Sequence, residues 1–145
     1  MSQNKVLDVL NRNRLLRHSE EIYAFENALN ELAENQNSDY LEDLHLVLDD
    51  RCEQPDVMFG LIHLLESFEL EEQLRAFVSI VSKLMITAPD WTQILHNRIL
   101  NDEPACKLYK EILHSFNSRQ PHFIYQLLEE SASSRLDSMK VKEFM

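Results

Sequence analysis

The chain has 145 residues, of which 44% are apolar and 27% charged, a balance typical of a soluble globular domain and unlike that of a disordered chain. Its formal net charge of −11 is unevenly spread, because sixteen carboxylates and a single base lie between Glu20 and Glu72. A concentrated negative field repels nucleic acid and anionic lipid and speeds the encounter with a basic protein. The composition therefore argues against nucleic acid and membranes as partners. Alternatively, these carboxylates are the solvated faces of ordinary acidic helices.

Gly60 is the only glycine in the chain. Glycine supplies the positive-φ positions of hairpins and phosphate-binding loops, so its scarcity disfavours β-meanders and nucleotide sites. The apolar neighbours of Gly60 predict a close contact between helices instead. No signal-peptide pattern or membrane-length apolar run is present, and we expect one cytoplasmic domain over residues 1–145. Cys52 and Cys106 lack a CxxC partner and are expected to be reduced packing residues.

Apolar residues recur at spacings of three and four along most of the chain, which is the pattern of amphipathic helices. Several of these segments follow a Ser or Asp that can act as an N-cap, and others open with a proline. In chain order, the pattern predicts a helix capped by Ser19 with Ile22 to Leu32 inward, Tyr40 to Asp50 capped by Asp39, Pro55 through Phe68, Leu70 to Leu84, a helix capped by Asp90, and two helices opened by Pro104 and Pro121. Residues 131–145 form a weakly amphipathic tail that we expect to fray.

An internal similarity bears on the fold class. Shifting the sequence by 51 positions aligns Asp39, Tyr40, Leu44 and His45 with Asp90, Trp91, Leu95 and His96. Two stacked units of three helices would explain this match, and so would chance similarity between amphipathic helices of equal length. We predict an all-α fold, a helical-repeat-like stack of about six to eight helices resembling armadillo or HEAT repeats.

Two Glu-x-x-His pairs, Glu42 with His45 and Glu111 with His114, have the spacing found in di-iron helical bundles. Such ligands must face the core, whereas the glutamate of each pair lies beside another charged residue and away from the apolar stripe. His63, on a strongly apolar helix, is expected to be a hydrogen-bonded core residue. No nucleotide loop, nucleophile elbow or Cys/His metal spacing is present. We therefore predict no catalytic residues, no metal and no cofactor.

The segment of residues 58–84, followed by WTQILHNRILN at residues 91–101, carries a family resemblance. An apolar helix from Leu61 to Glu66 leads into a Glu-rich helix start, and Trp91 and the Arg-Ile-Leu-Asn run ending at Asn101 follow. This pattern, over roughly residues 40 to 130, resembles the bacterial polymorphic-toxin immunity protein 30 family, small all-helical proteins encoded beside toxin genes.

The resemblance implies a non-enzymatic immunity protein of the contact-dependent inhibition type, which binds and neutralises one cognate toxin. The local acidity suggests that this toxin is basic, as a nuclease would be, and that the inhibitor covers its active or substrate-binding surface. The alternative is a helical-repeat adaptor that binds a different protein. We expect the toxin to contact a group of carboxylates, hereafter the acidic cluster, made up of Glu42, Asp43, Asp49, Asp50, Glu53 and Asp56.

Three residues of the family-like segment also have structural interpretations. Trp91, beside a helix cap, is expected to be a core anchor. Arg98 is placed to bind the last carbonyls of its helix, and Asn101 to adopt a left-handed conformation at the helix end. We therefore predict that this segment forms a corner of the fold.

Overall fold

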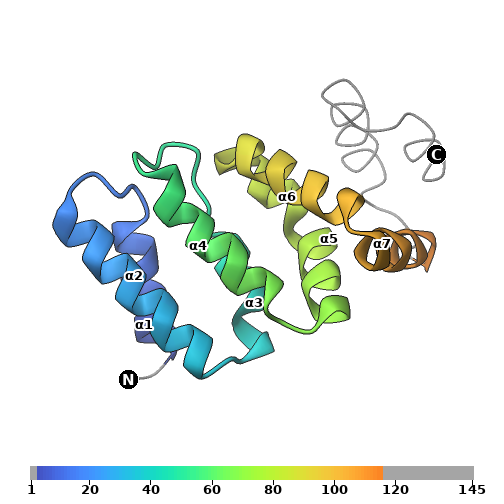
Figure 1. Ribbon diagram of the computed structural model, residues 1–145, viewed down its shortest axis with the longest axis horizontal. Coiled ribbons are helices and arrows are strands. Elements are labelled where there is room, and N and C mark those ends of the chain that lie inside the picture. Colours follow the sequence, from blue (N-terminus) through green and yellow to red (C-terminus); the bar gives the residue numbers. More distant parts are fainter. Residues whose placement is uncertain (1–2, 116–145) are drawn as a thin grey trace.

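The amphipathic segments of the sequence become seven α-helices and one 3-10 turn in the computed structural model, which describes residues 3–115 and has no strand within them. The elements are α1 Gln3–Asn13, α2 Ser19–Glu34, the 3-10 turn η1 Ser38–Tyr40, α3 Leu41–His45, α4 Pro55–Glu66, α5 Leu70–Thr87, α6 Pro89–Asn101 and α7 Glu103–Ser115. They follow one another from α1 and α2 at one end of the molecule to α6 and α7 at the other (Figure 1). The predicted all-α class is confirmed.

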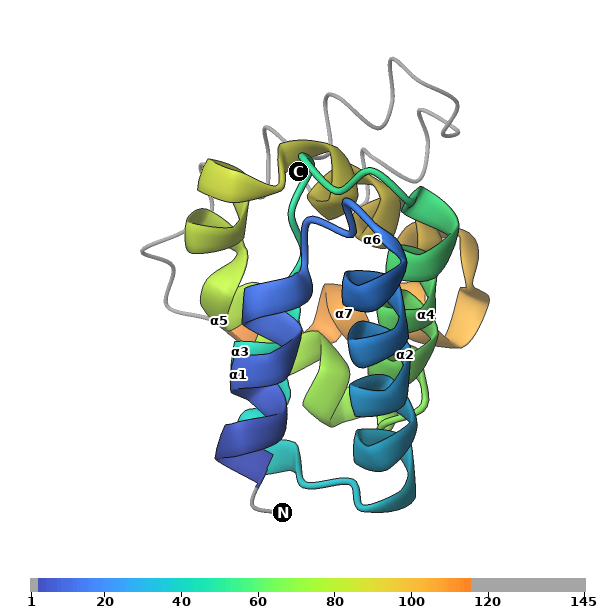
Figure 2. The same ribbon diagram turned by 90° about the vertical axis from the view of Figure 1, so that its left-hand side faces the viewer.

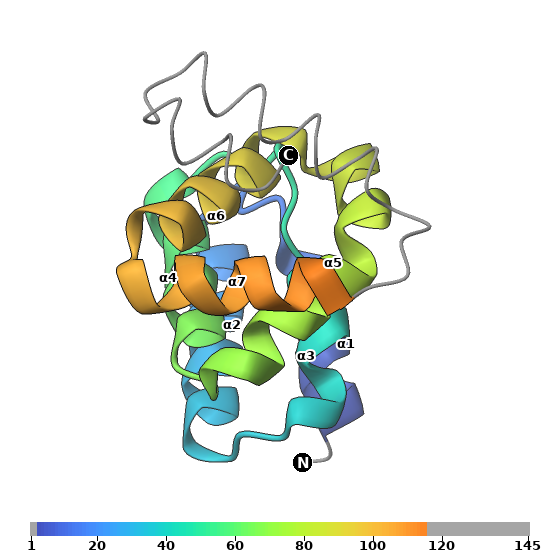
Figure 3. The same ribbon diagram turned by 90° about the vertical axis from the view of Figure 1, so that its right-hand side faces the viewer.

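One continuous core joins the helices. Helix α2 packs between α1 and α4, and α5 packs against α3, α4, α6 and α7. Figure 2 shows the α1–α2 pair at one end of the molecule, and Figure 3 shows α7 near the other. Gly60 lies where α4 approaches α2, because a Cβ atom there would stand 3.2 Å from Cδ1 of Leu29. The predicted close contact at the only glycine is therefore confirmed.

The helices opened by proline were predicted best. Pro55 starts α4 and Pro89 follows the end of α5, as a ring that fixes φ and removes an N–H donor requires. Pro104 lies in the first turn of α7, where Asp102 accepts a hydrogen bond from the Ala105 amide over 3.1 Å. Local chemistry thus accounts for these boundaries.

Several other boundaries differ from the prediction. Helix α1 was not predicted, since its sequence is mostly polar and buries few residues, chiefly Val6, Leu7 and Leu10. Helix α3 ends at His45 rather than Asp50. The turn before α3 is capped by Asn37, whose side chain accepts from the Asp39 amide. The chain beyond His45 forms turns and a loop that reaches α4.

Residues 3–115 show no helical repeat. Helix α3 has five residues, whereas α6, with which the 51-residue shift aligns it, has thirteen. The predicted helix at Pro121 and the tail over residues 131–145 lie outside the described residues. The cysteines fit the expected packing role, because Cys106 is buried and Cys52 is half-buried.

The core contains two histidines around Phe77. The rings of His45 and His96 lie 6.4 and 6.1 Å from the Phe77 ring, centre to centre. His45 donates from Nδ1 to the Leu41 carbonyl over 2.8 Å, and Nε2 of His96 lies 2.9 Å from the Tyr109 hydroxyl. Burial lowers the pKa of His45 to about 4 and that of His96 to about 3. Both rings are therefore neutral at physiological pH.

Trp91 is a core residue, as predicted, with only 5% of its surface exposed and its ring edge-on to Phe59. We expect Trp91→Ala to lower the free energy of unfolding by about 3 to 5 kcal/mol, because it leaves a large cavity. Urea denaturation measures the change. The matched control is Tyr23→Ala, which removes an exposed aromatic ring. Unchanged stability of the Trp91 variant would contradict the assigned role.

The buried histidines predict acid sensitivity. Since their folded pKa values lie below the unfolded value of about 6.5, the unfolded chain takes up protons first as the pH falls. Each neutral histidine contributes its full share to the free energy of unfolding above about pH 6.5. This contribution declines as the pH falls further, by about 2 kcal/mol per residue at pH 5.

Urea denaturation between pH 7 and pH 5 tests this dependence, in a range where carboxylates remain mostly ionised. His96→Phe should flatten the slope, whereas His63→Gln and His114→Gln, which replace exposed rings, should leave it unchanged. A slope that His96→Phe does not alter would count against the neutral buried pair.

Candidate functional site

The acidic cluster divides into two groups in the structure. Asp49 is completely buried and Asp50 is half-buried. The other four side chains are exposed, Glu42 and Asp43 on α3, and Glu53 and Asp56 around the start of α4. Sequence reasoning treated all six as one surface, whereas the structure buries Asp49 and half-buries Asp50.

Asp49 joins two parts of the chain. Its carboxylate forms an ion pair with Arg14 Nε at 3.1 Å, and it accepts hydrogen bonds from the Arg51 guanidinium over 3.1 and 2.9 Å and from the Arg51 amide over 2.9 Å. Burial opposes ionisation of Asp49, but the hydrogen bonds from Arg51 and the charges of both arginines outweigh it and hold its pKa below the usual value. Asp49 is thus an ionised, buried residue that links two loops, and a partner cannot contact it.

Asp50 caps a helix from a distant position in the chain. Its carboxylate oxygens accept from the amides of Asp90, over 2.8 Å, and Trp91, over 3.1 Å, at the start of α6. Its own amide donates to the Thr87 carbonyl at the end of α5 over 3.3 Å. Asp50 satisfies amides that the first turn of a helix leaves free. The cap predicted for Asp90 therefore belongs to Asp50, forty residues earlier.

The loop between α1 and α2 is fixed against the loop that follows α3. The Leu15 carbonyl accepts from the Glu53 amide over 2.8 Å, and buried Leu16 has a φ of 52°, a conformation that bulky residues rarely adopt. Such a conformation persists only where its surroundings hold it. Arg14, which reaches Asp49, belongs to the same loop. Sequence analysis assigned no role to these N-terminal residues.

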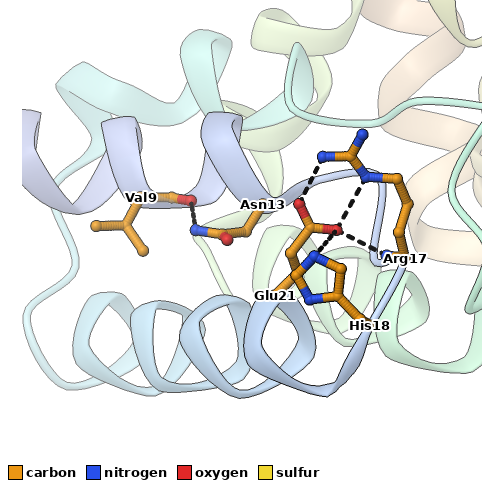
Figure 4. Close-up of polar contacts among 5 residues, drawn as sticks. All are labelled: Val9, Asn13, Arg17, His18 and Glu21. Carbon is orange, nitrogen blue, oxygen red and sulfur yellow. Dashed lines mark hydrogen bonds and ion pairs between the residues drawn. The ribbon is translucent and has the colours of Figure 1, made fainter.

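Glu21, in the first turn of α2, binds the residues that precede the helix. Figure 4 shows its carboxylate held by the Arg17 side chain over 3.2 and 2.9 Å and by the Arg17 amide over 2.8 Å, with His18 at 3.9 Å. The hydrogen bonds from Arg17 lower the pKa of Glu21 to about 2. The same view shows Asn13 at the end of α1 donating to the Val9 carbonyl over 2.7 Å. The N-cap position belongs to His18, whereas Ser19 had been predicted.

The Glu-x-x-His residues are not assembled into a metal centre. His45 is buried on the Leu41 carbonyl, while Glu42, Glu111 and His114 are exposed. Within residues 3–115, no group of three or more His, Cys, Asp or Glu side chains could hold a metal ion. His63 is exposed with its ring near Phe59, so the prediction of a buried histidine there was wrong.

Arg98 connects two helices. It donates from Nε and one terminal nitrogen to the two carboxylate oxygens of Glu66, each over 2.7 Å, and its guanidinium lies 5.3 Å from the centre of the Phe59 ring. The predicted contact with the last carbonyls of its own helix is replaced by this tie between α6 and α4. Asn101 does not adopt the left-handed conformation, since Leu16 is the only non-glycine residue in the described part of the chain with a positive φ. The prediction that this segment forms a corner of the fold agrees with the Arg98 contacts.

These features define a small helical protein in which part of the acidity holds the fold together and part faces outward. None of the helices in the described part is long and apolar enough to cross a membrane. Residues 12–109 match the model of the family Immunity protein 30, and the chain belongs to that family. The predicted resemblance is confirmed, over a range that starts and ends earlier than expected. No curated protein and no solved structure matches the chain.

Membership carries two consequences. Proteins of this family are non-enzymatic inhibitors, and a cognate toxin is the partner that membership implies. Within the acidic cluster, a partner can reach the exposed carboxylates but not the buried Asp49.

The two central aspartates should affect stability to different extents. We expect Asp49→Ala to lower the free energy of unfolding by about 3 kcal/mol, the lower end for a broken buried ion pair, because Arg51 remains hydrated. Asp50→Ala should cost about 1 kcal/mol through loss of the α6 cap. Asp56→Ala, an exposed control, should change it by less than about 0.5 kcal/mol. Urea denaturation of the three variants gives the ranking, and equal values for Asp49 and Asp56 would refute it.

Proposed function

We propose that the protein binds one cognate antibacterial toxin in the cytoplasm and neutralises it by covering its active or substrate-binding surface. The family match over residues 12–109 is the observation that carries this proposal. The setting is growth competition between bacteria, as in contact-dependent inhibition. The adaptor alternative depended on a helical repeat, and the described helices lend it no support.

The proposed toxin is basic, and a nuclease domain is the best candidate. A protein that acts on nucleic acid needs a cationic surface to bind phosphates, and an inhibitor rich in carboxylates can occupy that surface. Opposite charges also speed association, which matters to a cell that must neutralise the toxin before damage occurs. The net charge of −11 supports this choice of partner.

Within the acidic cluster, we assign the contact with toxin to the exposed members, Glu42, Asp43, Glu53 and Asp56. Asp49 and Asp50 take part indirectly, since they fix the loop that carries Glu53. Exposed charges at the rim of an interface act mainly on the association rate, because they remain hydrated in the complex. We therefore expect these four residues to steer the toxin and not to supply most of the affinity.

Co-expression tests the function directly. The toxin gene adjacent to this one is expressed with and without the protein, and growth is measured. We expect growth to be restored by this chain and not by an unrelated acidic protein of similar charge. Failure of rescue despite normal expression of both proteins would refute the proposal.

The steering role predicts a salt-dependent change in kinetics. Reversing Glu53 and Asp56 together to lysine should slow association with the purified toxin roughly tenfold at low salt and less at high salt, with dissociation little changed. The matched control reverses Glu103 and Glu111, two exposed carboxylates on α7. Stopped-flow measurements at two salt concentrations provide the rates. Unchanged association at low salt would remove this surface from the interface.

A further inference from the structure

A shallow and largely apolar groove lies between α1 and α2, hereafter the α1–α2 groove. It encloses about 310 Å³ and is lined largely by Val6, Val9, Tyr23, Ala24, Asn27 and Glu31. Figure 2 shows the two helices side by side at the end of the molecule, where nothing else among the described helices lies over them. The groove is therefore open to a partner.

Tyr23 makes this groove unusual. Its side chain is 71% exposed, and in the described part of the chain only Ile86, at 81%, is another large hydrophobic residue so exposed. Tyrosine is among the residues that most often anchor protein interfaces, because its large rigid ring costs little conformational entropy to fix. An exposed tyrosine beside an apolar groove has the character of an interface centre.

The charges around the groove indicate which partner fits it. Glu20, Tyr23, Asn27, Glu31 and Glu34 follow one another at spacings of three and four, so they lie along the same side of α2. The three glutamates have no ion pair among the described residues, in contrast to Glu21 with Arg17. Glu31 and Glu34 moreover occupy the last turns of α2, at the negative end of the helix dipole, where a carboxylate is unfavourable. Within the described contacts these two charges cost helix stability.

We propose that the α1–α2 groove is the centre of the toxin interface, where an apolar side chain of the basic toxin packs against Tyr23 and flanking lysines or arginines pair with the glutamates of α2. This inference rests on the proposed function. It supplies what the exposed acidic cluster lacks, because stable interfaces combine an apolar centre with a polar rim. A second copy of this chain fits less well, since a two-fold contact through α2 would set the same glutamates against one another.

The proposal separates two kinetic roles. A residue at the apolar centre is desolvated in the complex, so that its removal should mainly speed dissociation. The exposed acidic cluster should mainly affect association, as argued above. Variants of the two surfaces can therefore be told apart with the same toxin preparation.

The test measures association and dissociation of purified toxin from four proteins by surface plasmon resonance. Beside the natural chain, Tyr23→Ala removes the ring, Asn27→Arg places a bulky cation in the groove, and Ile86→Ala is a matched control that removes the other exposed hydrophobic side chain. We expect at least a tenfold faster dissociation for Tyr23→Ala and a larger loss for Asn27→Arg, with no change for Ile86→Ala. Thermal melting checks that all three fold, as exposed positions should allow.

The outcomes separate the two proposals. If the natural chain neutralises and binds toxin while both groove variants dissociate at its rate, the groove is not the interface and the proposed function stands. If the natural chain neither rescues growth nor binds toxin, the proposed function itself fails, and this inference with it. If sedimentation shows a dimer of the natural chain that Tyr23→Ala converts to monomer while toxin binding persists, the groove belongs to a second copy and the inference is overturned.

Discussion

The loop between α3 and α4 holds the two ends of the molecule together through two adjacent carboxylates. Asp49 is tied to Arg14 in the α1–α2 loop, and Asp50 caps α6. Because the two residues are neighbours in the chain, a movement of this loop would disturb both contacts at once. Together with the helical core, these charged contacts help to fix where the N-terminal pair stands relative to α6. Glu53, one of the exposed carboxylates, lies in the same loop.

The acidic residues of the chain therefore serve two purposes, which the net charge alone does not distinguish. Asp49, Asp50 and Glu21 accept hydrogen bonds from other parts of the chain, and these bonds define loops and helix starts. The exposed carboxylates are displayed on this already ordered framework. Order in the free protein lowers the entropic cost of association. A rigid acidic surface is thus well suited to rapid capture of a basic partner.

Sequence reasoning succeeded where a local rule decides the outcome. Pro55 and Pro89 mark helix boundaries by the geometry of their own rings, and Trp91 is buried because a large apolar ring beside a helix start seldom stays in water. It failed where the partner is distant in sequence. The cap from Asp50 to α6 and the pair of Arg98 with Glu66 span 40 and 32 residues, and no pattern of spacing identifies such partners in advance.

The extent of the family match gives the two walls of the α1–α2 groove different significance. The wall formed by α2, with Tyr23 and Glu31, lies inside the matched residues 12–109, whereas Val6 and Val9 on α1 precede them. An inhibitor must recognise its own toxin and reject others, which requires a shared mode of binding together with positions that differ among relatives. An aromatic anchor on α2 can provide the common contact, and the apolar residues of α1 set the shape of the groove that receives the partner side chain. We therefore expect substitutions at the half-buried Val9 to alter which toxin is bound more than whether the fold can bind one.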